Sequence, residues 1–444
     1  MSKRNFILLI IILIIITVAA FWYFDFFKPA VPGETTEGGT NFLSRFNPFG
    51  KSSPPPTGGP IPTPTPGSEP PIPTSELKLK KVSSMPVAGF GVFQKERFKE
   101  IVATETQITA EGGTPPKKAV AAPPEREFAP ALRYVARANG NIYQTFADKI
   151  EERRFTSTVM PKIYEAYFGN KGRMVIMRNL KTDDKTIQTF VGTLPEELLG
   201  GDTTADNSVV GSFLPENITD LSLSADMTKA FYLFNMNANA GNVIGTTIDL
   251  LTNKKVQVFE NAFTEWLSFW PNSKMITLTT KPSASVPGYM YALDPNLKTF
   301  GRVFGGINGL TTLASPSGKL VLYSDNTLSL YLYHLDTKVS DILGIKTIPE
   351  KCVWGAKSDI VYCSVPAGAP TGEYPDQWYQ GEISFTDQIW QIDISNGTTR
   401  IMLDPGIEPG GETVDGIKLA LDEGQNYLFF VNKKTSFLWE FNLR

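Results

Sequence analysis

Downstream of Leu77, short apolar runs alternate with clusters of turn residues. The runs are rich in Val, Ile, Tyr, Phe and Thr, and turn residues interrupt them about every ten positions. Almost no helical periodicity is present in this region. The pattern predicts an all-β domain over residues 77–444, preceded by segments of a different character.

One phrase recurs in this domain: a strand, a tight polar turn and a strongly apolar strand. Its copies centre on Asn170-Lys171-Gly172, Asp226-Met227-Thr228, Pro271-Asn272-Ser273, Pro316-Ser317-Gly318, Ala356-Lys357-Ser358 and Asp422-Glu423-Gly424. A second phrase, a strand that ends in aspartate, follows most copies, at Asp249, Asp294, Asp336 and Asp393. Each pair of phrases supplies four strands, and the spacing of about 45 residues is that of a four-stranded propeller blade.

The repeats predict a β-propeller of seven blades, with six or eight as alternatives. The first blade is assembled from Val87–Phe93, Leu132–Ala136, Ile142–Phe146 and Arg153–Thr158, with a disordered insertion at about 104–129. The last blade, made of Ile417–Leu421, Tyr427–Val431 and Phe437–Phe441, lacks a fourth strand. Leu77–Ser83 is able to supply it, and this pairing of the two ends would close the ring without exposed edges.

These motifs resemble those of TolB-like and WD-type repeat propellers. The resemblance rests on turns such as Ser315-Pro316-Ser317-Gly318-Lys319 between apolar strands, each followed by an Asp-containing strand, and it covers Leu77 to Arg444. Tyr374 to Asp393 also resembles membrane-anchored propellers of candidate-phyla bacteria. The resemblance implies a fold and leaves function open, because such propellers serve as interaction platforms, as accessory domains of peptidases and in some cases as enzymes.

The N-terminal part predicts a single-pass membrane anchor. Phe6 to Phe24 contains no charged residue and is long enough to cross a bilayer, and Lys3 and Arg4 precede it. We therefore expect a cytoplasmic tail at 1–4, a transmembrane signal anchor at 5–27 and a propeller outside the cytoplasm at the cell membrane. A signal peptide cleaved after Ala20 is the alternative.

Residues 28–76 predict a disordered stalk. Ten of the twenty residues from Pro54 to Pro73 are proline, interleaved with Thr, Ser and Gly. Such a segment forms neither helix nor sheet and favours extended polyproline II structure. Its predicted role is to hold the propeller away from the membrane.

Composition excludes several functions. A formal charge of -3 argues against nucleic-acid binding. The chain has one histidine, His334, which nearly removes Ser-His-Asp catalysis and multi-histidine metal sites. Its two cysteines, Cys352 and Cys363, flank a predicted hairpin and are expected to form a disulfide, with two buried thiols as the alternative. No cofactor and no metal site are predicted.

A loop insertion at about 366–385 is the best candidate for a ligand site. It concentrates aromatic and acidic residues, which suit sugar or peptide recognition: Tyr374, Asp376, Trp378, Tyr379 and Glu382. The alternative is that the loop packs its own aromatic side chains as a plug. The recurrent aspartates are interpreted as turn residues, because Asp accepts hydrogen bonds from backbone amides that follow it.

The sequence favours a membrane-tethered module that binds an extracytoplasmic protein, peptide or glycan, and it predicts no catalytic residue. A carboxylate-based enzyme such as a glycoside hydrolase is a second hypothesis, and it requires two convergent acids. A structural scaffold for a membrane complex is a third.

Overall fold

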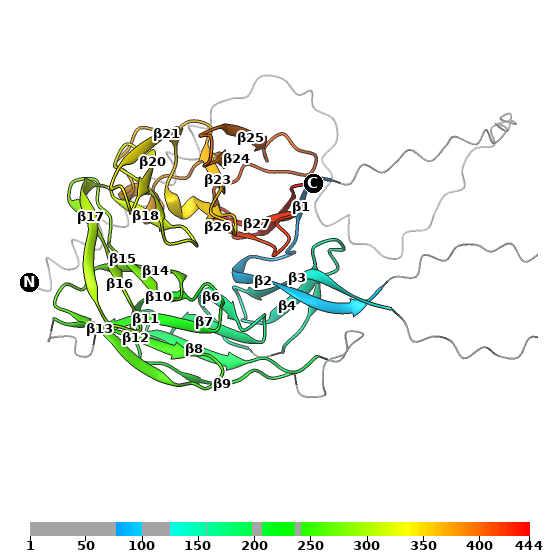
Figure 1. Cartoon of the computed structure of the whole chain (residues 1–444). Helices are drawn as coiled ribbons and strands as arrows, with labels where there is room; N and C mark the ends of the chain where they lie inside the picture. Colours follow the sequence, from blue (N-terminus) through cyan, green and yellow to red (C-terminus); the bar gives the residue numbers. More distant parts are fainter. Residues whose placement is uncertain (1–76, 100–124, 158, 198–206, 236–240) are drawn as a thin grey trace, which may run out of the picture. The chain divides into compact units, whose positions relative to one another are not determined.

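The computed structural model describes residues 77–99, 125–157, 159–197, 207–235 and 241–444. The described residues all lie within Thr74–Arg444, which forms one compact unit. They form seven antiparallel sheets of four strands each, arranged as the blades of a propeller ring (Figure 1). The prediction of seven four-stranded blades is confirmed.

Each blade is a meander, and we number the blades along the chain. Blade 1 contains β2 (Val87–Phe98), β3 (Arg126–Ala136), β4 (Ile142–Phe146) and β5 (Arg153–Arg154). Blade 2 contains β6 (Ile163–Gly169), β7 (Met174–Leu180), β8 (Ile187–Thr193) and β9 (Val210–Phe213). Blade 3 contains β10 (Ile218–Leu223), β11 (Lys229–Asn235), β12 (Val243–Asp249) and β13 (Lys255–Asn261). Blades 4 and 5 contain β14 (Trp266–Asn272), β15 (Met275–Thr280), β16 (Pro287–Leu293) and β17 (Phe300–Asn308), then β18 (Thr311–Ala314), β19 (Leu320–Ser324), β20 (Ser329–His334) and β21 (Ser340–Lys346).

Blades 6 and 7 carry the short helices and complete the ring. Blade 6 contains β22 (Cys352–Trp354), β23 (Ile360–Pro366), β24 (Asp387–Asp393) and β25 (Thr399–Leu403), and blade 7 contains β26 (Gly416–Leu421), β27 (Tyr427–Asn432), β28 (Leu438–Asn442) and β1 (Leu79–Lys81). The 3-10 helix η2 (Pro349–Lys351) precedes blade 6, and the helix α2 (Asp376–Gln380) lies between β23 and β24. The first strands of most neighbouring blades contact one another, as β2 and β6 do, so the first strands are the innermost strands of the ring.

The core lies between the blades. The second strands are buried on both faces, and all six residues of Tyr427–Asn432 are buried. This explains why they read in the sequence as unbroken apolar runs instead of alternating ones. The outer strands are exposed, as all four residues of Val210–Phe213 show.

The recurrent aspartates are turn residues, as predicted. Asp249 Oδ1 accepts hydrogen bonds from the backbone N–H groups of Leu251 and Thr252, at 3.2 and 2.9 Å. Asp294 and Asp393 make equivalent bonds with backbone N–H groups that follow them. These bonds stabilise the ionised carboxylates and lower the pKa of all three.

The two ends of the domain close the ring together. β1 pairs with β28 in antiparallel register, with Leu79 opposite Phe441 and Lys81 opposite Trp439. This is the pairing that was predicted for Leu77–Ser83. One outer strand from the N-terminal side therefore completes a blade whose other strands are the last three of the chain.

Two boundaries in blade 1 differ from the prediction. β2 runs to Phe98, beyond the predicted end at Phe93, and it pairs with a β3 that begins at Arg126. The charged residues there were interpreted as an insertion, but cross-strand ion pairs such as Arg97 Nε with Glu127 Oε1, 2.7 Å apart, support a longer hairpin. Residues 100–124 of that insertion lie outside the described residues.

No helix of the described residues is both long enough and apolar enough to cross a membrane. The predicted cytoplasmic tail (1–4), anchor (5–27) and stalk (28–76) lie outside the described residues.

Candidate functional site

The predicted disulfide is present in blade 6. Cys352 of β22 and Cys363 of β23 lie directly opposite each other, and their sulfur atoms are 2.09 Å apart. Both cysteines are buried in the apolar cluster between blades 5 and 6, together with Trp354 and Val361.

The antiparallel order of the strands defines two faces of the ring. In every blade, the start of the first strand lies at the same end as the connection between the second and third strands. We call this end the entry face. It carries the predicted ligand loop between Pro366 and Asp387, the helix η2 and the turn after Asn432. The other end, the exit face, carries the turns that begin with the recurrent aspartates.

The predicted ligand loop reaches across several blades of the entry face. The Asp376 carboxylate accepts a hydrogen bond of 2.5 Å from the backbone N–H of Ala284, in blade 4. On the other side, Lys433 of blade 7 donates to the backbone oxygen of Trp378. The loop is thus fixed to blades 4 and 7 as well as to its own blade.

The aromatic residues of the loop divide into buried and exposed ones. Tyr374 and Trp378 are 5% and 3% exposed, and they pack with Phe385, Leu328 and Ile348 in one cluster. These two side chains behave as the plug that was weighed as the alternative. Tyr379, at 39% exposed, and the exposed Glu382 remain accessible. Three of the five predicted ligand residues are thus within reach of a ligand: Tyr379, Glu382 and the half-buried Asp376. The buried rings of Tyr374 and Trp378 are not.

A buried group of charges anchors the loop, and the sequence reasoning missed it. The Lys351 ammonium donates to Asp387 Oδ2 at 2.7 Å and to Asp415 Oδ1, and all three side chains are 0% exposed. Trp378 Nε1 and the backbone N–H of Phe385 each donate to Asp415 Oδ2 at 3.0 Å. Nothing in the sequence around Lys351 distinguishes it from a surface lysine.

A second group of charges lies on the innermost strands and their neighbours at the entry face. Glu165 of β6 accepts a bond of 2.5 Å from Arg178 and lies 3.9 Å from the ammonium of Lys418 on β26. Arg178 also donates to the backbone oxygen of Ile218 at 2.6 Å. Although burial opposes ionisation, Lys418 and Arg178 lower the pKa of Glu165.

Two further acids complete this inner group. Asp220 of β10 accepts a bond of 2.6 Å from the backbone N–H of Ser268, and burial raises its pKa. Glu350 of η2 accepts a hydrogen bond from the Tyr379 hydroxyl. The Glu350 side chain is exposed, but the protein around it and the negative charge of Asp220 raise its pKa.

The inner group joins the predicted loop to the innermost strands. Tyr379 connects the two, because it belongs to the loop and bonds to Glu350. The inner acids were not predicted, since one sequence does not reveal that residues from blades 2, 3 and 6 converge. For Glu165 and Asp220, the signal is an acidic residue at the third position of an innermost strand.

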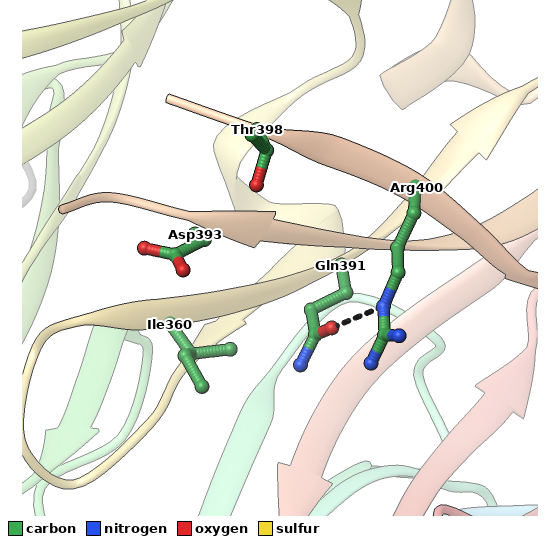
Figure 2. Close-up of a pocket in the computed structure, with 5 residues that line it drawn as sticks. All are labelled: Ile360, Gln391, Asp393, Thr398 and Arg400. Carbon is green, nitrogen blue, oxygen red and sulfur yellow. Dashed lines mark hydrogen bonds between the residues drawn. The ribbon is translucent and has the colours of Figure 1, made fainter. Parts of the chain in front are cut away.

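Two cavities lie away from this group. One of about 380 Å³ on blade 6 is lined by Gln391, Asp393 and Arg400, with Arg400 Nε bonded to Gln391 Oε1 at 2.6 Å (Figure 2). The other, of about 580 Å³, lies beside blade 1, where Lys95 contacts Glu197 at 2.5 Å. Neither contains a predicted site residue. Within the described ranges, no three His, Cys, Asp or Glu side chains converge as metal ligands.

Among the comparisons with known proteins, only the search of solved structures found matches. No family model and no curated protein matches the chain. Solved structures that match include an oligogalacturonate lyase from Vibrio parahaemolyticus (8% identity, TM-score 0.45, covering 70% of this chain and 85% of that one). An oligogalacturonate lyase in complex with manganese matches at 9% identity and TM-score 0.46, over 71% and 85% of the two chains.

TolB from Acinetobacter baumannii also matches, at 10% identity and TM-score 0.38, over 71% of this chain and 76% of that one. TM-scores below 0.5 at these identities carry no argument about function. The predicted seven-bladed propeller fold is confirmed by the blades themselves. The resemblance to membrane-anchored propellers of candidate-phyla bacteria stays a prediction.

Proposed function

We propose that this chain is a membrane-tethered, extracytoplasmic propeller that binds a protein partner at its entry face. The observation that carries the proposal is the loop between Pro366 and Asp387. Its aromatic rings and buried charges fix it to three blades, while Tyr379 stays exposed beside the inner acids. A rigid aromatic residue on an anchored loop contacts a partner at a low cost in conformational entropy.

The compartment is supported by two independent features. A disulfide such as Cys352–Cys363 persists in oxidising compartments and is rare in the cytosol. The uncharged run from Phe6 to Phe24, with basic residues before it, is typical of an anchor whose following domain is outside the cytoplasm. A proline-rich spacer between an anchor and a propeller suits a binding module that acts at a distance from the lipid.

The chemistry of the site favours a partner segment with a positive charge. The inner group holds Glu165, Asp220 and Glu350 against Arg178 and Lys418, so acids exceed bases by one. Both basic residues pair with Glu165, whereas Asp220 and Glu350 form no ion pair among the described residues. A lysine or arginine of the partner, placed between these carboxylates and the Tyr379 ring, would gain charge-assisted hydrogen bonds and a cation–π contact.

One observation favours a second candidate, a carboxylate-based hydrolase. The pKa values of Asp220 and Glu350 are both raised, and the charge of Asp220 contributes to the shift of Glu350, as in a pair of catalytic acids. Binding fits better, because both carboxylates already accept bonds from the protein, from Ser268 N–H and Tyr379 OH. Hydrolysis of a glycan by the wild-type chain that is abolished in an Asp220→Asn variant would favour the enzyme instead.

The binding proposal is tested with a phage-displayed peptide library selected on the full-length chain. We expect enriched peptides to share Lys or Arg, and to lose binding to Glu350→Gln and Tyr379→Ala variants. The matched control is Leu297→Ala, which removes a side chain that is 74% exposed on the exit face. Peptides that bind all variants equally, or that lack basic residues, would contradict the proposal.

A further inference from the structure

We propose that Lys351 and Asp387 form an intramolecular isopeptide bond, which would be a covalent clamp within blade 6. The proposal concerns the buried group under the ligand loop and is independent of what the entry face binds. The Lys351 ammonium is 2.7 Å from Asp387 Oδ2, and neither side chain has solvent-accessible area. An amine and a carboxyl group held in contact without water are the two reactants of an amide condensation.

The Lys351 nitrogen is enclosed by protein, within reach of both a carboxyl group and a base. Its nitrogen lies 5.4 Å from the ring centre of Trp378 and 5.3 Å from that of Phe385, and the residue is 0% exposed. A lysine amine becomes a nucleophile once a nearby base takes its proton. Asp415, which accepts a hydrogen bond from the same nitrogen, is in place to act as that base.

The two aspartates are not equivalent, and their contacts assign different roles to them. Both carboxylate oxygens of Asp415 have hydrogen-bond partners: Lys351 donates to Oδ1, and Trp378 Nε1 and the Phe385 backbone N–H donate to Oδ2. Asp387 Oδ1 is buried without a hydrogen-bond partner among the described residues, which disfavours an ionised carboxylate there. Burial raises the pKa of Asp387, and the charge of Asp415 adds to this effect. Asp387 is therefore the acid that is attacked.

The reaction is a condensation that releases one water. The Lys351 ammonium transfers a proton to the Asp415 carboxylate, and the free amine adds to Cγ of the protonated Asp387 carboxyl group. As the amine nitrogen loses a second proton, the C–OH bond of Asp387 breaks and the hydroxyl departs as water, with Asp415 relaying the proton. The backbone N–H of Gly416, 2.7 Å from Asp387 Oδ2, stabilises the negative charge that develops on the oxygen that stays. No oxidant or further reactant is required.

The bond would close a segment of 36 residues that contains the whole ligand loop. Lys351 is followed directly by Cys352, so the isopeptide bond and the disulfide would clamp the same blade from adjacent positions. The two covalent bonds would stabilise blade 6 at the entry face, where the predicted ligand loop contacts blades 4 and 7. A surface domain that stands away from the cell would gain resistance to unfolding and proteolysis.

Peptide mapping of the reduced full-length chain tests the proposal. Trypsin needs a free lysine side chain, so we expect no cleavage after Lys351 and one branched peptide that joins the segments of Lys351 and Asp387. Its mass should equal that of the two peptides less one water. Recovery of the two peptides as separate species from the wild-type chain would overturn the proposal, and a branch at Asp415 would overturn the assignment of the two aspartates.

Two variants distinguish the role of Lys351 as a reactant from that of Asp415 as the base that relays protons. Lys351→Arg keeps the positive charge but should yield no branched peptide, and Asp415→Asn should lose most of it because the base is missing. A fully branched Asp415→Asn chain would refute the role of Asp415. The test on the wild-type chain does not depend on whether either variant folds. The measured mass of its branched peptide is compared with the mass calculated from the sequence.

Discussion

Glu440 is expected to make the stability of the propeller fall as the pH rises. This residue of β28 is 1% exposed, and its Oε2 is buried without a hydrogen-bond partner among the described residues. It lies opposite Lys80 of β1, in the blade that closes the ring. Burial raises the pKa of Glu440 to about 8; Lys80 opposes this shift, and Asp148 and Asp422 add to it.

The magnitude follows from the two pKa values. An unfolded chain loses the Glu440 proton near the ordinary value of 4.5, whereas the folded chain keeps it up to about 8. Between these values the native state binds one more proton than the unfolded state, so the free energy of unfolding falls with rising pH. The difference between the two pKa values corresponds to up to about 5 kcal/mol in the free energy of unfolding. This stabilisation is fully present below pH 4.5 and is lost by about pH 8.

Urea unfolding across this pH range, followed by tryptophan fluorescence, measures the effect. A Glu440→Gln variant should unfold like the wild type near pH 5 and be several kcal/mol more stable near pH 8.5, because glutamine does not ionise. Glu423→Gln, at an exposed position of the same blade, is the control and should keep the wild-type slope. If the Glu440→Gln variant keeps that slope as well, the buried-acid reasoning is refuted.

Four further predictions address closure, the disulfide, the loop and the compartment. A chain that starts after Ser83 lacks β1, so it should melt at a lower temperature and be cleaved faster by protease. Cys363→Ser should cost about 3 kcal/mol in denaturant unfolding, and the same loss should follow reduction of the wild type. Trp378→Ala should cost about 3 to 5 kcal/mol by the same measurement, whereas Tyr379→Ala should change stability by less than about 1 kcal/mol. Alkaline phosphatase fused after Arg444 should be active in a bacterial host, since this enzyme requires export.

The fold was predictable because the blade repeats its own local chemistry. Every copy of the turn phrase precedes a strand buried on both faces, and each recurrent aspartate, such as Asp249 and Asp294, bonds to its own turn. Even ring closure followed from counting strands in the last blade. The limits of the β2–β3 hairpin were not predictable, because Arg97 and Glu127 look like solvated insertion residues until they pair.

The site was harder to predict, because its members meet across blades that are distant in the sequence. The partner of Glu165 on β26 is Lys418, and the aspartates that bind Lys351 come from β24 and from the start of blade 7. No local pattern marks such pairs. Within the predicted ligand loop, composition could not distinguish Trp378, which is buried, from Tyr379, which is exposed.

The central claim is that the entry face binds a partner, and site-specific photo-crosslinking in cells tests it most directly. A photoreactive phenylalanine analogue would replace Tyr379 in one chain and Leu297, on the exit face, in another. The account predicts a reproducible adduct from position 379, lost when Glu350→Gln is added, and none from position 297. Equal adducts from both positions, or an adduct from position 297 with none from 379, would contradict it.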